Sequence, residues 1–134
     1  MRRAPAAFTL AVAAICALVA GCGDKAKSSG SVTVDAGKPV EVKADEYSFN
    51  PATITVRTGG RRGVVPVTFR LKNEGSLPHD ISVRQGSAER GGTQAVGGGK
   101  TAVSTVALRP GEYVIFCSIG DHEKLGMKGA LHVE

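Results

Sequence analysis

The sequence predicts an all-β domain, an antiparallel sandwich or barrel of eight strands. Short runs with alternating apolar and polar residues, rich in β-branched side chains, recur from residue 31 to the end and are separated by Gly, Pro and Asn. No segment keeps a helical apolar period beyond about one turn. The 134 residues, 42% of them hydrophobic and none of them Trp, suit one modest core. Strands at this spacing are typical of sandwiches and barrels.

The first four predicted strands follow one another through residue 73. "SVTVDA" and "VEVKADEYSF" alternate polar and apolar residues, "ATITVRT" follows an Asn-Pro pair, and "VPVTFRLKN" follows the Gly-rich stretch at 59–63. The predicted ranges are residues 31–36, 40–49, 52–58 and 65–73.

Four more strands complete the domain. "HDISVRQ" follows Pro78, "TAVSTVAL" follows a run of Gly, "EYVIFC" follows a Pro-Gly turn, and "KGALHVE" ends the chain. These predict strands at residues 79–85, 101–108, 112–117 and 128–134. The Gly-rich stretches at 59–63 and 86–100 are interpreted as connections, because neither has the Gly-Lys-Ser/Thr ending of a phosphate loop. The second is long enough to be mobile or to carry a short flap over one sheet.

The N-terminal segment reads as an export signal. Arg2 and Arg3 precede an apolar run at 6–20 that is too short to span a bilayer stably. "LVAGC" resembles the end of a bacterial lipoprotein signal, which implies cleavage before Cys22 and acylation of its thiol. We therefore expect a lipoprotein signal peptide at 1–21, a flexible Lys- and Ser-rich tether at 22–31 and the folded domain at 32–134. The protein would be lipid-anchored on the extracytoplasmic (periplasmic or cell-surface) side of a membrane; the alternative is a soluble secreted protein cleaved after an Ala.

The charge of the mature chain argues against a nucleic-acid partner. Removal of residues 1–21 takes away two of the 17 Lys and Arg and leaves 15 against 12 Asp and Glu, a net charge of about +3. These charges are spread along the chain, and no basic run is interleaved with aromatic residues.

Cys117 is the one free thiol expected in the mature protein, because Cys16 leaves with the signal and Cys22 is acylated. A lone thiol in an oxidising compartment is ordinarily buried among apolar residues or bound to something. His122 and Met127 follow Cys117 with four residues in each gap, and neighbouring strands would bring His79 to the same loop. Cys and two His with a weak axial Met form the blue-copper site, whereas zinc more often takes four short ligands.

Each of these residues has an ordinary alternative, such as a surface His or a core Met, and only the ordered set favours a metal. His132 lacks ligand spacing and is expected to face the surface.

The chain resembles the cupredoxin family, particularly its plastocyanin-like and azurin-like bacterial members, over about residues 40–134. The matching segments are "YSFNPATITVRTG", "VTFRLKNEGSLPHDISV" and "LRPGEYVIFCSIGDHEKLGMKGALHV". The resemblance implies a Greek-key β-sandwich that holds one type 1 copper ion, cycling between Cu(I) and Cu(II). It implies that the four copper ligands are His79, Cys117, His122 and Met127.

Some positions depart from the family pattern. Many relatives have Asn after the first His, but this chain has Asp80, which accepts hydrogen bonds and does not donate them. We expect Asp80 to accept from Ser118, and its charge to favour Cu(II) and lower the reduction potential. Gly120 and Asp121 replace a common Pro-Gly pair, which bears on the choice of partner.

The resemblance implies an electron carrier and no enzymatic activity, because no ligand position is left for a substrate and the chain has only three His. It also implies that His122 reaches the surface through an apolar patch, with Leu77, Pro78, Ile119 and Leu125 as candidates. Redox proteins such as cytochromes or oxidases would dock there transiently, and we expect a monomer. The alternatives are a copper storage or delivery lipoprotein and a metal-free interaction module of the same fold.

Overall fold

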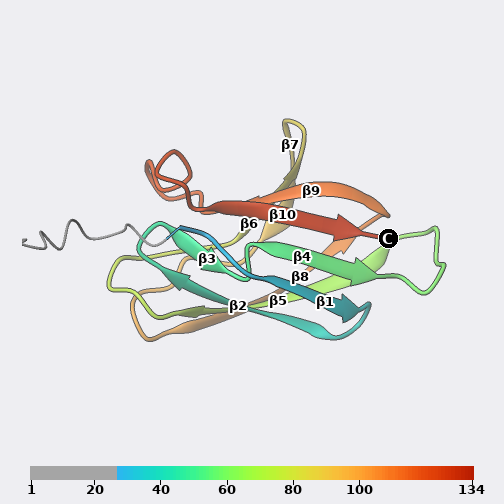
Figure 1. The fold of residues 1–134 in the computed structure, drawn as a ribbon, viewed down its shortest axis with the longest axis horizontal. Helices are drawn as coiled ribbons and strands as arrows, with labels where there is room; N and C mark the ends of the chain where they lie inside the picture. Colours follow the sequence, from blue (N-terminus) through green and yellow to red (C-terminus); the bar gives the residue numbers. More distant parts are fainter. Residues whose placement is uncertain (1–26) are drawn as a thin grey trace, which may run out of the picture.

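The computed structural model describes residues 27–134, and the predictions for the signal peptide and Cys22 fall outside the described residues. The described chain is all-β and folds into two sheets packed as layers (Figure 1). Its strands are β1 (Ser31–Asp35), β2 (Pro39–Asp45), β3 (Ser48–Asn50), β4 (Thr53–Arg57), β5 (Val65–Asn73), β6 (Ser82–Gln85), β7 (Ala88–Gly92), β8 (Thr101–Leu108), β9 (Gly111–Phe116) and β10 (Lys128–Val133). Within this part of the chain, no helix is long and apolar enough to cross a bilayer.

One sheet has six strands in the order β1-β4-β10-β9-β6-β7, and the other has four in the order β3-β2-β5-β8. Strand β9 lies inside the six-stranded sheet, antiparallel to both β10 and β6. Phe116, its last residue, pairs with Lys128 on one side and Ser82 on the other. The residue that follows, Cys117, therefore leaves a strand whose backbone is held on both sides.

The all-β architecture with two sheets is confirmed, but the described residues form ten strands where the sequence predicted eight. Residues 40–49, predicted as one strand, are two, because a turn reverses the chain at Tyr47, whose φ is 60°. β3 then folds back on β2, so that Ala44 faces Phe49 and both side chains are buried. The second extra strand, β7, lies inside the segment at 86–100 that was predicted as a connection.

The sheets are also mixed, whereas the sequence predicted antiparallel pairing. β4 runs parallel to both β1 and β10, and β2 runs parallel to β5. Alternation along a strand shows which face is buried but not the direction of the neighbouring strand, so this feature was not visible in the pattern.

The core lies between the two sheets. β2 and β5 bury every second residue, as their alternating sequence predicts. Side chains at most 1% exposed include Val42, Phe69 and Leu71 from the four-stranded sheet and Ile54, Ile115 and Leu131 from the six-stranded sheet.

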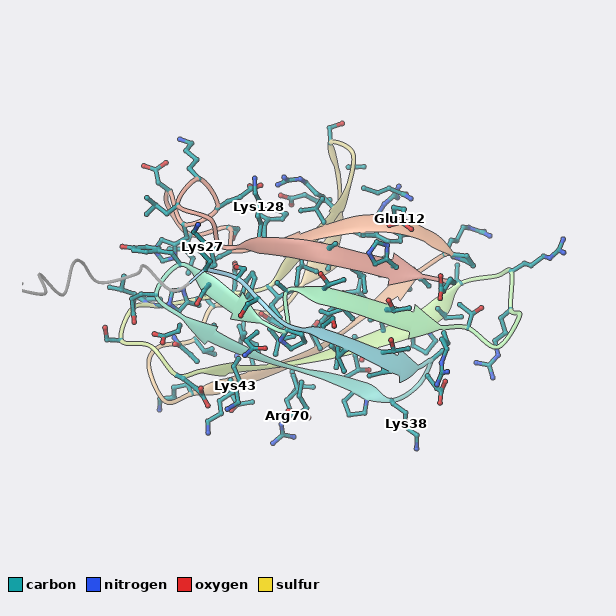
Figure 2. The ribbon with its side chains drawn as sticks, viewed as in Figure 1. Lys27, Lys38, Lys43, Arg70, Glu112 and Lys128 are labelled. Atoms are coloured by element: carbon teal, nitrogen blue, oxygen red, sulfur yellow. The ribbon has the colours of Figure 1, made fainter. Side chains whose placement is uncertain are left out.

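The folded domain begins earlier than predicted. Ser29 N donates to Phe49 O at 2.9 Å, and Ser28 Oγ donates to Gly126 O at 3.1 Å. Residues 28–31, assigned from the sequence to the tether, are therefore hydrogen-bonded to the domain. The described chain enters beside the loop that follows β9, and Figure 2 shows Lys27 at this same end of the molecule.

Candidate metal centre

Cys117 lies at the centre of the candidate site, directly after β9. Its backbone N–H donates to Met127 O at 3.1 Å, which closes the segment between them into a loop. The Cys117 side chain is 1% exposed, and Met127 is fully buried. The structure therefore brings the backbone of the predicted axial Met next to the backbone of the predicted thiolate residue.

The two predicted His ligands both turn Nδ1 toward this sulfur. Cys117 Sγ lies 3.5 Å from His122 Nδ1 and 4.0 Å from His79 Nδ1. The three donor atoms all lie within 4.8 Å of one another. A metal bonded at about 2.0 Å to nitrogen and about 2.3 Å to sulfur would separate N from S by about 3.5 to 3.8 Å. The donor set is therefore of the size that one metal ion needs.

His79 is held by contacts that the sequence did not reveal. Its backbone forms a two-way bridge with Val96, with N–O distances of 3.1 Å and 2.9 Å. Asn73, at the end of β5 and fully buried, donates from Nδ2 to Leu77 O and Val96 O. The Gly-rich segment at 86–100 thus holds the backbone of His79, the first predicted ligand, in place. Only its length hinted at a structural role.

His122 is placed by the hydrogen bonds of its own loop. Its N–H donates to Ile119 O at 3.1 Å, and Met127 N–H donates to His122 O at 3.0 Å. His122 is half-buried, in contrast to the fully buried His79. The repeated gap of four residues thus reflects turns that bring Cys117, His122 and Met127 together.

Asp80 and Ser118 tie the two ligand segments together. Ser118 N–H donates to Asp80 Oδ1 at 2.7 Å, and Ser118 Oγ donates to Asp80 Oδ2 at 2.5 Å. Asp80 is 7% exposed and follows His79, whereas Ser118 follows Cys117. The carboxylate acts as the acceptor in both bonds, which is the arrangement expected from its lack of a donor.

The β2–β3 turn is a further part of the site that the sequence analysis missed. Glu46 Oε1 accepts from Leu77 N–H at 3.0 Å and lies 3.9 Å from His79 Nε2. The backbone N–H of Leu77 is the largest cause that lowers the pKa of Glu46 to about 2. The ring of Tyr47 meets the His122 ring edge-on, with centroids 5.1 Å apart. The interrupted alternation at 45–48 signals a turn, but nothing in it indicates contact with ligands.

A partly buried ion pair anchors the ligand loop from the other side. Arg84 on β6 donates to both carboxylate oxygens of Glu123, at 2.8 Å and 2.5 Å. Its guanidinium carbon lies 4.4 Å from the centroid of the Phe116 ring. The residue next to His122 is thereby fixed to the six-stranded sheet.

Burial disfavours the charged forms of Cys117 and His79 in the metal-free site. It raises the pKa of the Cys117 thiol and lowers the pKa of His79. Such a site holds a proton on sulfur until a metal displaces it. One thiolate and two imidazoles, with a thioether beside them, are ligands that suit copper, and a trigonal set of this kind is the type 1 arrangement.

Comparison with known proteins agrees with this assignment. The family model of the cupredoxin-like domain matches residues 9–133. The chain belongs to the cupredoxin-like family. No curated protein matches the sequence.

Three solved structures resemble this cupredoxin, at identities that support the fold alone. The dithionite-reduced auracyanin of Roseiflexus castenholzii has a TM-score of 0.63 and 22% identity, with 74% of this chain and 98% of that chain covered. Auracyanin B has a TM-score of 0.63 and 19% identity, with 81% and 96% covered. Auracyanin A of Chloroflexus aurantiacus, described as a "blue" copper protein, has a TM-score of 0.57 and 22% identity, with 72% and 100% covered.

The predicted apolar patch is largely open to solvent. Leu77 is 37% exposed and Leu125 is 50% exposed, Pro78 is exposed, and Ile119 is partly buried against the core. These residues belong to the two segments that carry His79 and His122. His132, in contrast, lies outside the donor cluster on β10 and pairs with Glu112.

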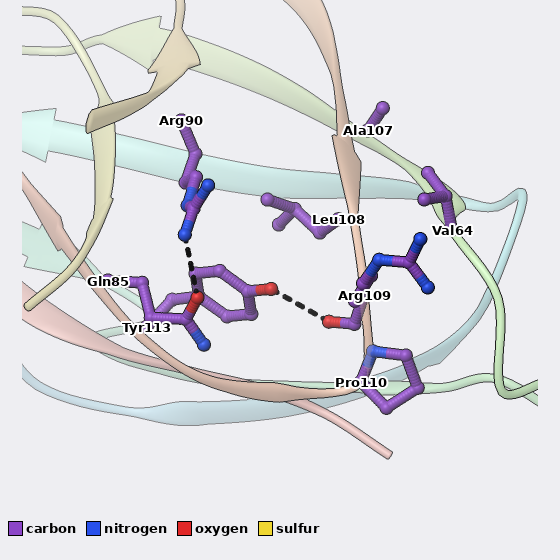
Figure 3. A pocket seen from close by; sticks show the side chains of 8 residues that line it. All are labelled: Val64, Gln85, Arg90, Ala107, Leu108, Arg109, Pro110 and Tyr113. Carbon is purple, nitrogen blue, oxygen red and sulfur yellow. Dashed lines mark hydrogen bonds between the residues drawn. The ribbon is translucent and has the colours of Figure 1, made fainter. Parts of the chain in front are cut away.

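Figure 3 shows a surface pocket of about 360 Å³ whose lining includes none of these ligands. Arg109 and Pro110 line it at the start of β9, a strand of six residues that spans about 20 Å before Cys117. Arg90 donates to Gln85 at its wall, and Tyr113 OH donates to Arg109 O. Because the pocket contains none of the predicted ligands, it plays no part in the candidate metal centre.

Proposed function

We propose that this cupredoxin carries single electrons between redox partners, through one type 1 copper ion held by His79, Cys117, His122 and Met127. The observation that carries the proposal is the convergence of the two Nδ1 atoms on the buried Cys117 Sγ, at 3.5 Å and 4.0 Å. A copper ion bound there would alternate between Cu(I) and Cu(II).

The scaffold suits electron transfer because it restricts ligand movement. Cys117 follows a strand paired on both sides, His79 is bridged to Val96, and Asp80 joins the two ligand segments. Ligands that move little between two oxidation states allow fast exchange of an electron.

The same donor set supports a carrier over an enzyme. Four protein donors leave no position for a substrate, and the third His of the chain, His132, lies outside the cluster.

Docking is proposed at the patch of Leu77, Pro78, Ile119 and Leu125. Half-buried His122 would provide the route, because its Nδ1 lies 3.5 Å from the buried Cys117 sulfur while the residue is partly exposed. A small apolar patch favours brief contacts with redox proteins such as cytochromes or oxidases, and the carrier would act as a monomer.

We also propose that the protein is exported and anchored by a lipid on Cys22. Ser28 is bonded to Gly126 of the ligand loop, so the chain enters the domain at the copper end. Six Cα-to-Cα steps lead from Cys22 to Ser28, which at full extension amounts to about 20 Å. The copper end would therefore stay close to the membrane surface, within reach of membrane-bound partners.

Voltammetry of the copper-loaded soluble domain tests the carrier function. We expect a reversible wave for one electron, absent from Cys117→Ser and retained by His132→Ala, a matched substitution outside the cluster. Absence of a reversible wave from the copper-loaded protein would refute electron transfer by this site.

A further inference from the structure

The β2–β3 turn places one carboxylate against the segment that carries His79. Glu46 Oε1 accepts from Ser76 N at 2.6 Å, Ser76 Oγ at 3.2 Å and Leu77 N at 3.0 Å. The approach is close enough that a Cβ at Gly75 would lie 2.5 Å from this oxygen. The Glu46 side chain is therefore held by its neighbours in one position, although it is 37% exposed.

The outer nitrogen of His79 lacks a partner in the described structure. His79 is fully buried, its Nδ1 faces Cys117 Sγ, and its Nε2 has no hydrogen bond within residues 27–134. If Nδ1 gives its lone pair to a metal, the ring proton must sit on Nε2. A buried N–H of this kind requires an acceptor.

Glu46 Oε1 is the carboxylate oxygen placed to serve, at 3.9 Å from Nε2. We propose that Glu46 is a positioning residue of the copper centre, whose Oε1 accepts the Nε2 proton of His79 and fixes the ring with Nδ1 toward Cys117. The proposal rests on copper binding by His79 as proposed above.

A carboxylate partner for the His79 ring predicts the direction in which the reduction potential shifts. A carboxylate that accepts the outer N–H of a ligand His orients the ring and makes its metal-bound nitrogen more basic. The more highly charged Cu(II) gains more from this than Cu(I) does. Glu46 should therefore lower the reduction potential as well as hold the ring.

Three variants separate this role from simple bracing of the loop. Glu46→Gln keeps an oxygen that can accept from Ser76 and Leu77 but removes the charge, whereas Glu46→Ala removes both. Glu74→Gln is the matched control, because Glu74 is 38% exposed at the same end of the molecule and pairs with Lys43 and Lys72 instead of His79.

Two readouts are measured on each variant. In Glu46→Gln the ratio of Cu(II) to Cu(I) affinity should fall about tenfold, which is a rise in potential of about 59 mV for one electron. In Glu46→Ala the Cu(II) affinity should fall by about 10- to 100-fold. In the Zn(II)-loaded protein, the His79 Nε2 proton seen by NMR should change its chemical shift in Glu46→Gln and exchange faster with water in Glu46→Ala. Glu74→Gln should match the wild type in both readouts.

The proposal is overturned if Glu46→Gln matches Glu74→Gln both in the affinity ratio and in the Nε2 proton signal, because Glu46 would then only brace residues 75–77. If the wild-type protein forms no thiolate-bound Cu(II), the electron-carrier function fails separately. The Zn(II) measurement then decides alone: a shifted Nε2 proton in Glu46→Gln supports the contact, and an unshifted one excludes it.

Discussion

The backbone N–H of Cys117 donates to the carbonyl of Met127 at 3.1 Å. This hydrogen bond joins the first and last predicted ligands of the loop, where the loop begins and ends. This bond sets the loop length independently of the metal. It also explains how Met127 can be fully buried although the residues before it, 124–126, are exposed. Backbone hydrogen bonding thus shapes the ligand loop, and we expect the donor atoms to be in position before a metal binds.

The weak axial role proposed for Met127 predicts the effect of Met127→Leu. We expect the variant to retain the blue colour and a higher reduction potential, since the trigonal ligands remain but the axial donor that stabilises Cu(II) is lost. The similar volume of Leu should limit the loss of stability to about 1.5 kcal/mol. Visible spectroscopy and potentiometry of the same sample check the colour and the reduction potential. A bleached protein would show that the thioether is a principal ligand.

Asp80→Asn should raise the reduction potential. The carboxylate accepts two hydrogen bonds from Ser118 beside the site, and its negative charge favours Cu(II). Asn retains one acceptor oxygen and removes the charge. Potentiometry against Asp121→Asn, which removes an exposed carboxylate from the loop of Ser118, isolates the effect, and an unchanged potential in Asp80→Asn would contradict this role.

Acid should destabilise the metal-free protein in two stages. Burial lowers the pKa of His79, so the unfolded chain binds the extra proton first and stability falls as pH drops below about 6.5. Glu46 has its pKa lowered to about 2, so its contribution is present above its unfolded value of 4.5 and is lost as pH falls toward 2. Urea denaturation from pH 8 to pH 3 measures this. His79→Gln should remove the first stage and leave the second, and a persisting first stage would contradict the assignment.

The Arg84–Glu123 pair should stabilise the ligand loop measurably. Both side chains are 28% exposed and the contact is bidentate, so we expect a coupling free energy of about 1 kcal/mol from a double-mutant cycle with Arg84→Met and Glu123→Gln. The Lys124–Asp121 pair is the control in the same loop, because its side chains are 82% and 70% exposed and its coupling should be near zero. Equal coupling free energies in the two cycles would show that the Arg84–Glu123 pair adds no stability to the ligand loop.

The proposed docking patch predicts a defect in rate without a defect at the metal. Leu125→Lys should slow electron exchange with a redox protein at least severalfold, because a charge enters an apolar contact, while its spectrum and potential stay unchanged. Val103→Lys on β8, at a site 60% exposed, is the matched control. Stopped-flow kinetics with a cytochrome compare the two, and equal rates would place docking elsewhere.

The sequence predicted most of the strands and the three donors of the ligand loop because both depend on local patterns. Val42, Phe69 and Leu71 alternate with polar residues, and the gaps between Cys117, His122 and Met127 match the turns of one loop. Contacts between distant segments have no such pattern. The bridge between His79 and Val96 and the approach of Glu46 to His79 depend on how the turns pack, which alternation does not encode.

The split of residues 40–49 shows the same limit. Both halves alternate correctly, yet Tyr47 takes a left-handed conformation that a non-Gly residue seldom adopts. Without that turn, neither Glu46 nor Tyr47 would reach the ligands. The part of the site most difficult to predict is therefore the part formed by a strained turn.

The type 1 copper site depends most directly on a bond between copper and the Cys117 sulfur. Visible absorption and electron paramagnetic resonance of the Cu(II)-loaded protein test this bond. We predict an intense charge-transfer band and a narrow copper hyperfine splitting, both lost in Cys117→Ser and kept in His132→Ala. A colourless protein, or one with the spectrum of an ordinary tetragonal Cu(II) site, would contradict the type 1 assignment and the electron-carrier function built on it.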